Sequence, residues 1–163
     1  VHGRGYLHLD VKPENILLVS GGEHRLIDFG LARRWPAPPT GAVWGTAWYM
    51  APEMAMGREL TPATDVYALA MTAYELLAGH LPYPPAADHA AVLRQQVELA
   101  PAPLPAVAPS VPAVVADAVM AGLAKAPSDR PSAAEPAAAL TAVVIGASGG
   151  DRTQAQGLQE PQR

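Results

Sequence analysis

A long apolar segment, residues 65–78, sets the strongest limit on how this chain can fold. Its large apolar side chains occupy nearly every face of a helix rather than one stripe: Val66, Leu69, Met71, Leu76 and Leu77. Thr61 and Pro62 precede the segment as an N-cap and a first-turn proline, and Gly79 follows it as a stop signal. Because a helix that is apolar all round must be buried, the chain is expected to form a mainly helical body around this segment.

A β-hairpin is expected near the N-terminus. Residues 16–19 and 24–27 are short apolar runs, and the Ser-Gly-Gly-Glu between them supplies a glycine-containing turn. Residues 31–45 contain several prolines and glycines, which predict an irregular loop. A hairpin, a long loop and then mostly helices is not the pattern of a doubly wound α/β sheet.

Further helices are expected toward the C-terminus. Asp88 can cap the first of them, and Ser110 can cap the second, which runs through Ala124. Ser132 and Glu135 form a capping box for the last helix. The apolar face of that helix consists of Leu140, Val143 and Val144.

Composition limits the classes of function. The chain of 163 residues has a net charge of −4 and no long basic run, which argues against binding nucleic acid. It has no cysteine, so disulfides and thiolate metal sites are excluded. The uncharged stretch at residues 136–147 is too short for a membrane segment, and no secretory signal opens the chain. We expect a soluble cytoplasmic protein with a disordered polar tail at residues 146–163.

Five short motifs follow one another along the chain: HLDVKPEN at residues 8–15, DFG at 28–30, GTAWYMAPE at 45–53, DVYALA at 65–70 and DRP at 129–131. Each motif alone is a weak signal, and a D-F-G is most often a turn that begins with Asp. Together they are a strong signal, because they include the only Asn and the only Phe of the chain. Their order is therefore more informative than any one of them.

This order and spacing resembles the Ser/Thr protein kinases of the bacterial, eukaryotic-like type. The resemblance covers residues 1–145 and implies the C-terminal lobe of a kinase domain. The implied fold is mainly α, with a short β-hairpin and about five or six helices. The N-terminal lobe of the family carries a Gly-rich loop and a phosphate-binding Lys that this sequence does not contain. That lobe is expected as a missing partner, supplied in cis if the chain is truncated.

The resemblance implies ATP and Mg²⁺ as cofactors and a protein Ser or Thr hydroxyl as phosphoryl acceptor. Asp10 would accept the proton of the attacking hydroxyl. Lys12 would lie beside it and neutralise charge on the transferring phosphoryl group. Asn15 and Asp28 would bind the nucleotide-associated Mg²⁺ through hard oxygen atoms, and the hairpin between them would bring them together.

The resemblance also bears on substrate type and regulation. Lys12 with Thr46 is typical of the Ser/Thr branch, and Thr46 is the candidate residue for positioning the substrate and the loop. Thr40 is the sole hydroxyl in the loop that follows D-F-G and is the candidate activation-loop phosphosite. Leu9 replaces the usual Arg that contacts a phosphorylated activation loop. Phosphorylation of Thr40 is therefore expected to change activity little.

Three charged residues are expected to be structural. Glu53, at the end of GTAWYMAPE, is expected to pair in the interior with the late Arg130. Asp65 is expected to hold the backbone of the catalytic loop.

Two alternatives to a protein kinase remain open. The chain could be a non-catalytic lobe that binds a protein partner, but such a lobe would not need all four of Asp10, Lys12, Asn15 and Asp28. Small-molecule kinases of the aminoglycoside type share the H-x-D-x-x-x-x-N loop, but they lack the segment that ends in A-P-E. Without an N-terminal lobe, the isolated chain is expected to show little or no phosphoryl transfer.

Overall fold

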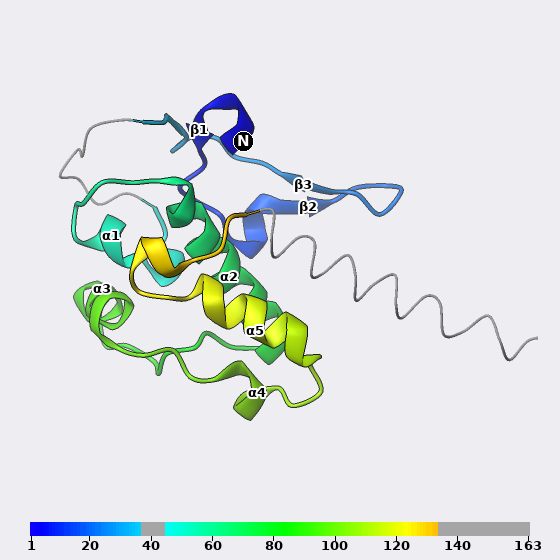
Figure 1. The fold of residues 1–163 in the computed structure, drawn as a ribbon, viewed down its shortest axis with the longest axis vertical. Helices are drawn as coiled ribbons and strands as arrows, with labels where there is room; N and C mark the ends of the chain where they lie inside the picture. Colours follow the sequence, from blue (N-terminus) through cyan, green and yellow to red (C-terminus); the bar gives the residue numbers. More distant parts are fainter. Residues whose placement is uncertain (37–44, 134–163) are drawn as a thin grey trace, which may run out of the picture.

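The structure, a computed structural model, describes residues 1–36 and 45–133. Its α-helices are α1 (Pro52–Ala55), α2 (Pro62–Ala78), α3 (His89–Glu98), α4 (Leu104–Val107) and α5 (Ala113–Gly122). Single turns of 3-10 helix are η1 (His2–Arg4), η2 (Pro13–Asn15), η3 (Ala47–Tyr49) and η4 (Pro127–Asp129). The strands form two antiparallel pairs, β1 (Tyr6–Leu7) with β4 (Arg33–Arg34) and β2 (Ile16–Leu18) with β3 (His24–Leu26). The expected mainly helical fold with one short hairpin is confirmed (Figure 1).

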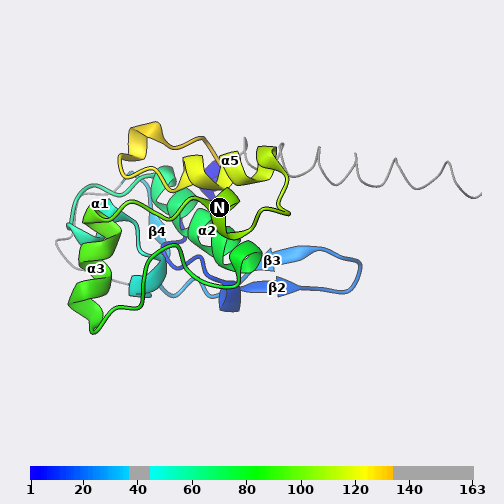
Figure 2. The same cartoon turned by 90° about the horizontal axis from the view of Figure 1, so that it is seen from below.

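Helix α2 lies at the centre of the helical body, with α5, α4, η3 and η4 packed against it (Figures 1 and 2). Tyr67, Met71 and Tyr74 on this helix are completely buried. The expected start and stop signals are both present: Thr61 caps the first turn and Gly79 ends the helix in the left-handed region, with φ 77°. The central buried helix that the sequence predicts is thus confirmed.

One part of the burial prediction is wrong. Leu69, Leu76 and Leu77 are exposed, with Leu76 at 69% of its full surface. These side chains line an apolar groove between α2 and α5. The exposure begins one turn after Val66, which is only 3% exposed, so the stripe covers the C-terminal half of the helix. The apolar pattern of a sequence predicts that a face avoids water, but it does not identify what covers that face.

Helix α5 begins at Ala113, and its N-cap is Pro112 and not Ser110 as expected. Pro112 is the reason, because a proline disfavours helical backbone in the residue before it, here Val111. The helix ends at Gly122, where it crosses α2 closely: a side-chain carbon at this position would lie 2.7 Å from the Cβ of Ala70. The proline-rich connector before α5 contains the short α4, which the sequence did not predict. The last expected helix, residues 132–145, and the expected tail lie outside the described residues from residue 134 onward.

The hairpin of β2 and β3 projects from the helical body (Figures 1 and 2). Ile16 pairs with Leu26 at its base and Leu18 with His24 near its turn. This agrees with the sequence prediction. Residues 31–45 were expected to be irregular throughout, but β4 within them pairs with β1. A pair of two-residue strands is too short for a periodic pattern, so the sequence carried no signal for it.

Glu53 and Arg130 form an ion pair inside the protein, although 77 positions separate them in the sequence. Both Arg130 terminal nitrogens donate to the Glu53 carboxylate, at 2.7 and 2.8 Å. Arg130 is 7% and Glu53 3% exposed. The guanidinium also donates to the carbonyl oxygens of Ala63, Ala124 and Lys125. It therefore ties α1, α2 and the segment after α5 together.

Substituting Arg130→Ala should lower the free energy of unfolding by roughly 3–5 kcal/mol, because the Glu53 carboxylate would stay buried without a partner. Urea denaturation monitored by tryptophan fluorescence measures this loss. The matched control is Arg94→Ala, which removes an exposed arginine from α3. Equal midpoints for Arg130→Ala and Arg94→Ala would contradict the interior pairing.

Candidate active site

The catalytic-loop motif is held against α2 by the carboxylate of Asp65. Its Oδ1 accepts a hydrogen bond from the Leu9 backbone N–H at 2.8 Å, and its Oδ2 accepts one from the His8 N–H at 2.8 Å. His2 contacts the same Oδ2 through Nε2 at 2.7 Å. Leu9 adopts φ 67°, a left-handed conformation that L-residues rarely take. The two backbone bonds to Asp65 hold this strained residue in place.

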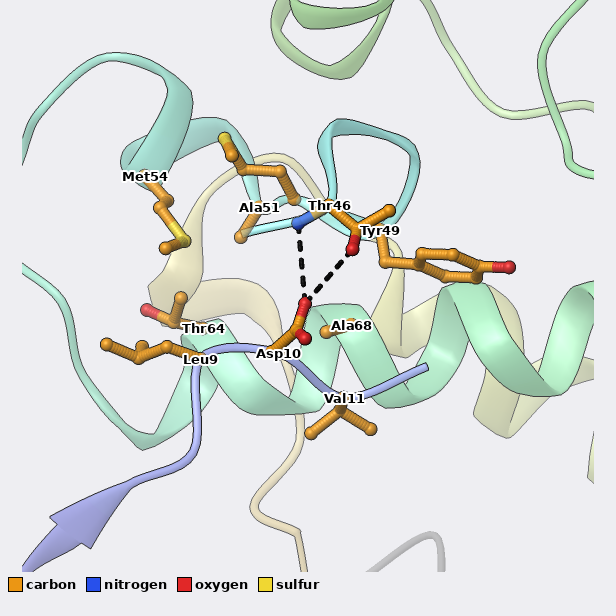
Figure 3. A pocket seen from close by; sticks show the side chains of 10 residues that line it. Leu9, Asp10, Val11, Thr46, Tyr49, Ala51, Met54, Thr64 and Ala68 are labelled. Atoms are coloured by element: carbon orange, nitrogen blue, oxygen red, sulfur yellow. Dashed lines mark hydrogen bonds between the residues drawn. The ribbon is translucent and has the colours of Figure 1, made fainter. Parts of the chain in front are cut away.

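The Asp10 carboxylate is the centre of a group of polar side chains, and Figure 3 shows its two hydrogen bonds to Thr46. The backbone N–H and the hydroxyl of Thr46 both donate to Oδ1, at 3.3 and 3.2 Å. Lys12 Nζ lies 2.8 Å from Oδ2, and the Asn15 side-chain amide donates to Oδ2 at 3.0 Å. Lys12 also donates to the Thr46 hydroxyl at 2.8 Å. The structure therefore brings three of the residues selected from the sequence to the carboxylate of a fourth.

These contacts keep Asp10 ionised. Partial burial raises the pKa of its carboxyl, but the hydrogen bond and charge of Lys12, with the Thr46 bonds, lower it more. The net pKa lies below the ordinary value of 3.8. A carboxylate in this state can accept a hydrogen bond from an incoming hydroxyl and orient it.

Gly45 allows Thr46 to reach Asp10. Its φ of 100° lies in the region that L-side chains rarely adopt. A side-chain carbon there would lie 3.1 Å from the Leu9 carbonyl oxygen and 3.7 Å from Asp10 Oδ1. The backbone before Thr46 therefore passes so close to the catalytic loop that only glycine fits without strain.

The hairpin links the two expected metal ligands. The Ile27 N–H donates to the Asn15 carbonyl oxygen at 2.9 Å, which places Asp28 next to the residue bonded to Asn15. Asn15 is buried, whereas Asp28 is exposed. Within residues 1–36 and 45–133, no group of three or more His, Asp or Glu side chains could hold a metal alone. One carboxylate and one amide fit Mg²⁺ that takes its other ligands from phosphate and water.

His8 is a site residue that the sequence reasoning missed. Its Nδ1 accepts a hydrogen bond from the Asp10 N–H at 3.3 Å, and its Nε2 contacts the Ile27 carbonyl oxygen at 3.0 Å. Its ring meets the Phe29 ring edge-on, with centroids 4.8 Å apart. It thus joins the catalytic loop to the D-F-G turn. Its position two residues before Asp10 in the motif was the available signal.

Comparisons with known proteins cover the same part of the chain as these site residues. A model of the protein kinase domain matches residues 1–139. The chain belongs to the protein kinase family. The serine/threonine-protein kinase PknA of Mycobacterium tuberculosis is 40% identical over 147 residues, which cover 88% of this chain and 33% of that protein. Pkn1 of Myxococcus xanthus, also a serine/threonine-protein kinase, is 37% identical over 137 residues, covering 79% of this chain and 20% of that protein.

The chain spans a third or less of these curated relatives. A further one, the serine/threonine-protein kinase PknK of Mycobacterium bovis, is 40% identical over 136 residues, or 82% of this chain and 12% of that protein. The bacterial Ser/Thr kinase resemblance read from the motifs is therefore confirmed over most of this chain. Among the described helices, none is both long and apolar enough to cross a membrane.

The end of the kinase activation segment has a second anchor that sequence reasoning missed. The Tyr49 hydroxyl donates to Glu75 Oε2 on α2 at 2.5 Å. Burial raises the pKa of the Tyr49 hydroxyl, and the bond and charge of Glu75 raise it further. The phenol thus stays protonated and remains a donor. No motif pairs these two residues, so only the fold could connect them.

Leu9 and Thr40 are the two residues expected to bear on phosphorylation control, and the structure describes only Leu9. Leu9 is buried at 6% exposure, against Met50, Met54 and Leu7. An apolar side chain in this place cannot bind a phosphate. Thr40 lies outside the described residues.

Substituting Lys12→Met should raise the pKa of Asp10, because burial remains while the main opposing charge is lost. A carbon-detected NMR titration of the Asp10 carboxyl measures the shift.

Because the folded pKa of Asp10 is depressed, the stability from this contact is present above the unfolded pKa and lost as pH falls through the folded pKa. The stability difference between parent and Lys12→Met should therefore vanish in strong acid. Lys12→Arg, which keeps the charge, is the control, and an unchanged Asp10 pKa in Lys12→Met would contradict this account.

Proposed function

We propose that this chain is the catalytic lobe of a Ser/Thr protein kinase, which transfers the γ-phosphoryl group of ATP to protein Ser or Thr hydroxyls. The observation that carries the proposal is the Asp10 carboxylate, contacted by Lys12, Thr46 and Asn15. A lobe that only binds a partner has no need for an ionised carboxylate held by this set.

Asp10 orients the acceptor hydroxyl and takes its proton as the oxygen attacks the γ-phosphorus. The bond from that phosphorus to the β-phosphate bridging oxygen breaks, and ADP leaves. Lys12, on the same carboxylate, supplies positive charge close to the transferring group. Thr46 fixes the carboxylate through two hydrogen bonds, so little reorganisation is needed during transfer.

Asn15 and Asp28 would hold Mg²⁺ in this proposal. When bound with ATP, the metal neutralises phosphate charge and orients the γ-phosphoryl group. In the described structure the Asn15 amide nitrogen donates to the Asp10 backbone and side chain, at 2.8 and 3.0 Å. The amide oxygen is then the atom left to act as the ligand. Asp28 adopts φ 59°, and its Oδ1 accepts the Gly30 N–H at 3.1 Å, which fixes the carboxylate in the turn.

Protein Ser or Thr, rather than a small molecule, is the acceptor in this proposal. The segment from Gly45 to Glu53 places Thr46 on Asp10 and Tyr49 on Glu75, and small-molecule kinases of the aminoglycoside type lack this segment. The names of the three relatives reported above, each a serine/threonine-protein kinase, support the same choice.

The 163-residue chain alone should phosphorylate a generic Ser/Thr substrate weakly or not at all, since its sequence contains no Gly-rich loop to hold ATP. Positioning can supply roughly 7–11 kcal/mol of such a barrier, and much of it needs a fixed nucleotide. Fused to the C-terminus of a protein-kinase N-terminal lobe, the chain should transfer ³²P from ATP. Asp10→Asn should abolish that transfer.

The matched control for Asp10→Asn is Asp117→Asn, which changes an exposed Asp on α5 and should leave the rate unchanged. Robust turnover by the short chain that Asp10→Asn abolishes would show that the N-terminal lobe matters less than proposed. A folded two-lobe protein without transfer would favour the non-catalytic binding lobe.

In the same two-lobe protein, Thr40→Ala should change the transfer rate by less than about twofold, because buried, apolar Leu9 cannot bind a phosphate. Phosphopeptide mass spectrometry of the parent, followed by a rate comparison, measures this. A large loss of activity in Thr40→Ala would mean that another group takes the place of the usual Arg.

A further inference from the structure

Lys125 is one of only two lysines in the chain, and the proposed phosphoryl transfer does not use it. It follows α5, yet its Nζ donates to the Tyr83 hydroxyl at 2.8 Å and to the Gln96 carbonyl oxygen at 2.6 Å. A longer contact of 3.4 Å reaches the carbonyl oxygen of Gln95. The ammonium also lies over the Tyr83 ring, 4.8 Å from its centroid. A flexible surface lysine would not make this set of contacts.

Counting hydrogens fixes the direction of the hydrogen bonds beyond Lys125. The Tyr67 hydroxyl has one hydrogen and donates it to Gln96 Oε1 at 2.6 Å. The 2.9 Å contact between the hydroxyls of Tyr67 and Tyr83 therefore requires Tyr83 to donate. The Tyr83 oxygen then accepts from Lys125, because a charged ammonium group has donors and no acceptor. The chain of donors runs from Lys125 through Tyr83 and Tyr67 to Gln96.

Gln96 connects this series of hydrogen bonds to the backbone of the activation segment. Its amide nitrogen donates to the carbonyl oxygens of Ala47 and Trp48, at 3.3 and 2.7 Å. Both belong to η3, the turn that directly follows Thr46. Carbonyl oxygens only accept, so they fix which end of the Gln96 amide faces the turn. Gln96 is 1% exposed, and water cannot easily replace a lost partner there.

Lys125 is partly buried and lies near a second cation, Arg130. Burial lowers the pKa of its ammonium to about 8, and the nearby Arg130 charge contributes to the lowering. Arg130 is fixed in the Glu53 pair and lies over the Tyr67 ring, so it cannot move away. At neutral pH Lys125 is still mostly protonated and supplies all its N–H groups.

We infer that Lys125 is a positioning residue for the activation-segment turn η3. Through Tyr83, Tyr67 and Gln96 it fixes the carbonyl groups of Ala47 and Trp48, and with them the neighbouring Thr46 that donates to Asp10. The hydrogen-bond part of this inference stands on contacts alone. Its consequence for substrate binding rests on the proposed function.

Amide hydrogen exchange of the 163-residue chain tests the inference without any turnover. The reporters are the Tyr49 and Met50 amides, which donate to the Thr46 and Ala47 carbonyl oxygens. In Lys125→Met these two amides should exchange about tenfold faster, while Met71 in the centre of α2 keeps its protection. Tyr83→Phe removes one hydroxyl from the same chain of donors and should give the same local change. It serves as the second variant if Lys125→Met fails to fold.

Two controls separate positioning from general stabilisation. Arg94→Met removes an exposed cation from α3 and should leave both reporters unchanged. Lys125→Arg restores a charged donor and should recover most of the protection. Equal acceleration at Met50 and Met71 would mean that Lys125 only stabilises the fold, and unchanged reporters would mean that η3 does not depend on it. Either result overturns the inference.

A kinetic comparison in the two-lobe protein adds the functional consequence. Lys125→Met should raise KM for the peptide substrate severalfold and leave KM for ATP unchanged, because η3 lies in the activation segment and not among the metal ligands. Unaltered peptide KM alongside faster exchange would restrict the inference to structure and overturn its functional part. If the parent shows no transfer, the proposed function fails, while the exchange result still decides the positioning role.

Discussion

The site depends on the hydrogen bonds that the Asp65 carboxylate accepts. It lies on the buried helix α2 and accepts hydrogen bonds from two consecutive backbone N–H groups, those of His8 and Leu9. A carboxylate that accepts such bonds is a strong anchor, since charged acceptors form roughly twice as strong a bond as neutral ones. The left-handed Leu9 then turns the chain so that Asp10 faces Thr46. The buried helix α2 thus determines where the Asp10 carboxylate lies.

Helix α2 supplies more than an apolar core. Asp65 contacts the catalytic loop and Tyr67, in the same turn, contacts Gln96, while Glu75 in a later turn contacts Tyr49. Buried polar groups of this kind cost stability when unpaired, so they select one arrangement of the surrounding loops. The apolar residues between them provide the burial. The helix therefore determines both the compactness of the lobe and the placement of its irregular segments.

The sequence predicted those parts of the molecule in which a local pattern determines the structure. The start and end of α2, the Asp88 cap of α3 and the hairpin all have such patterns, and all are present. Asp10, Lys12, Asn15 and Thr46 were found from motifs, and the fold places them together. Tyr49 with Glu75, and Lys125 with Tyr83, could not be found in this way. Their partners lie in different elements, and their residue types are common at ordinary positions.

The hairpin has a consequence for the tolerance of insertions. Asn15 and Asp28 are brought together at its base, through the backbone bond from Ile27 to Asn15. The turn at Gly21 and Gly22 lies at the far end and projects from the body. Extra residues there would lengthen the loop without changing which residues face each other at the base. This makes the turn a natural place to carry a tag, a fluorophore or a lineage-specific extension, while a one-residue slip within the strands would turn every side chain to the opposite face.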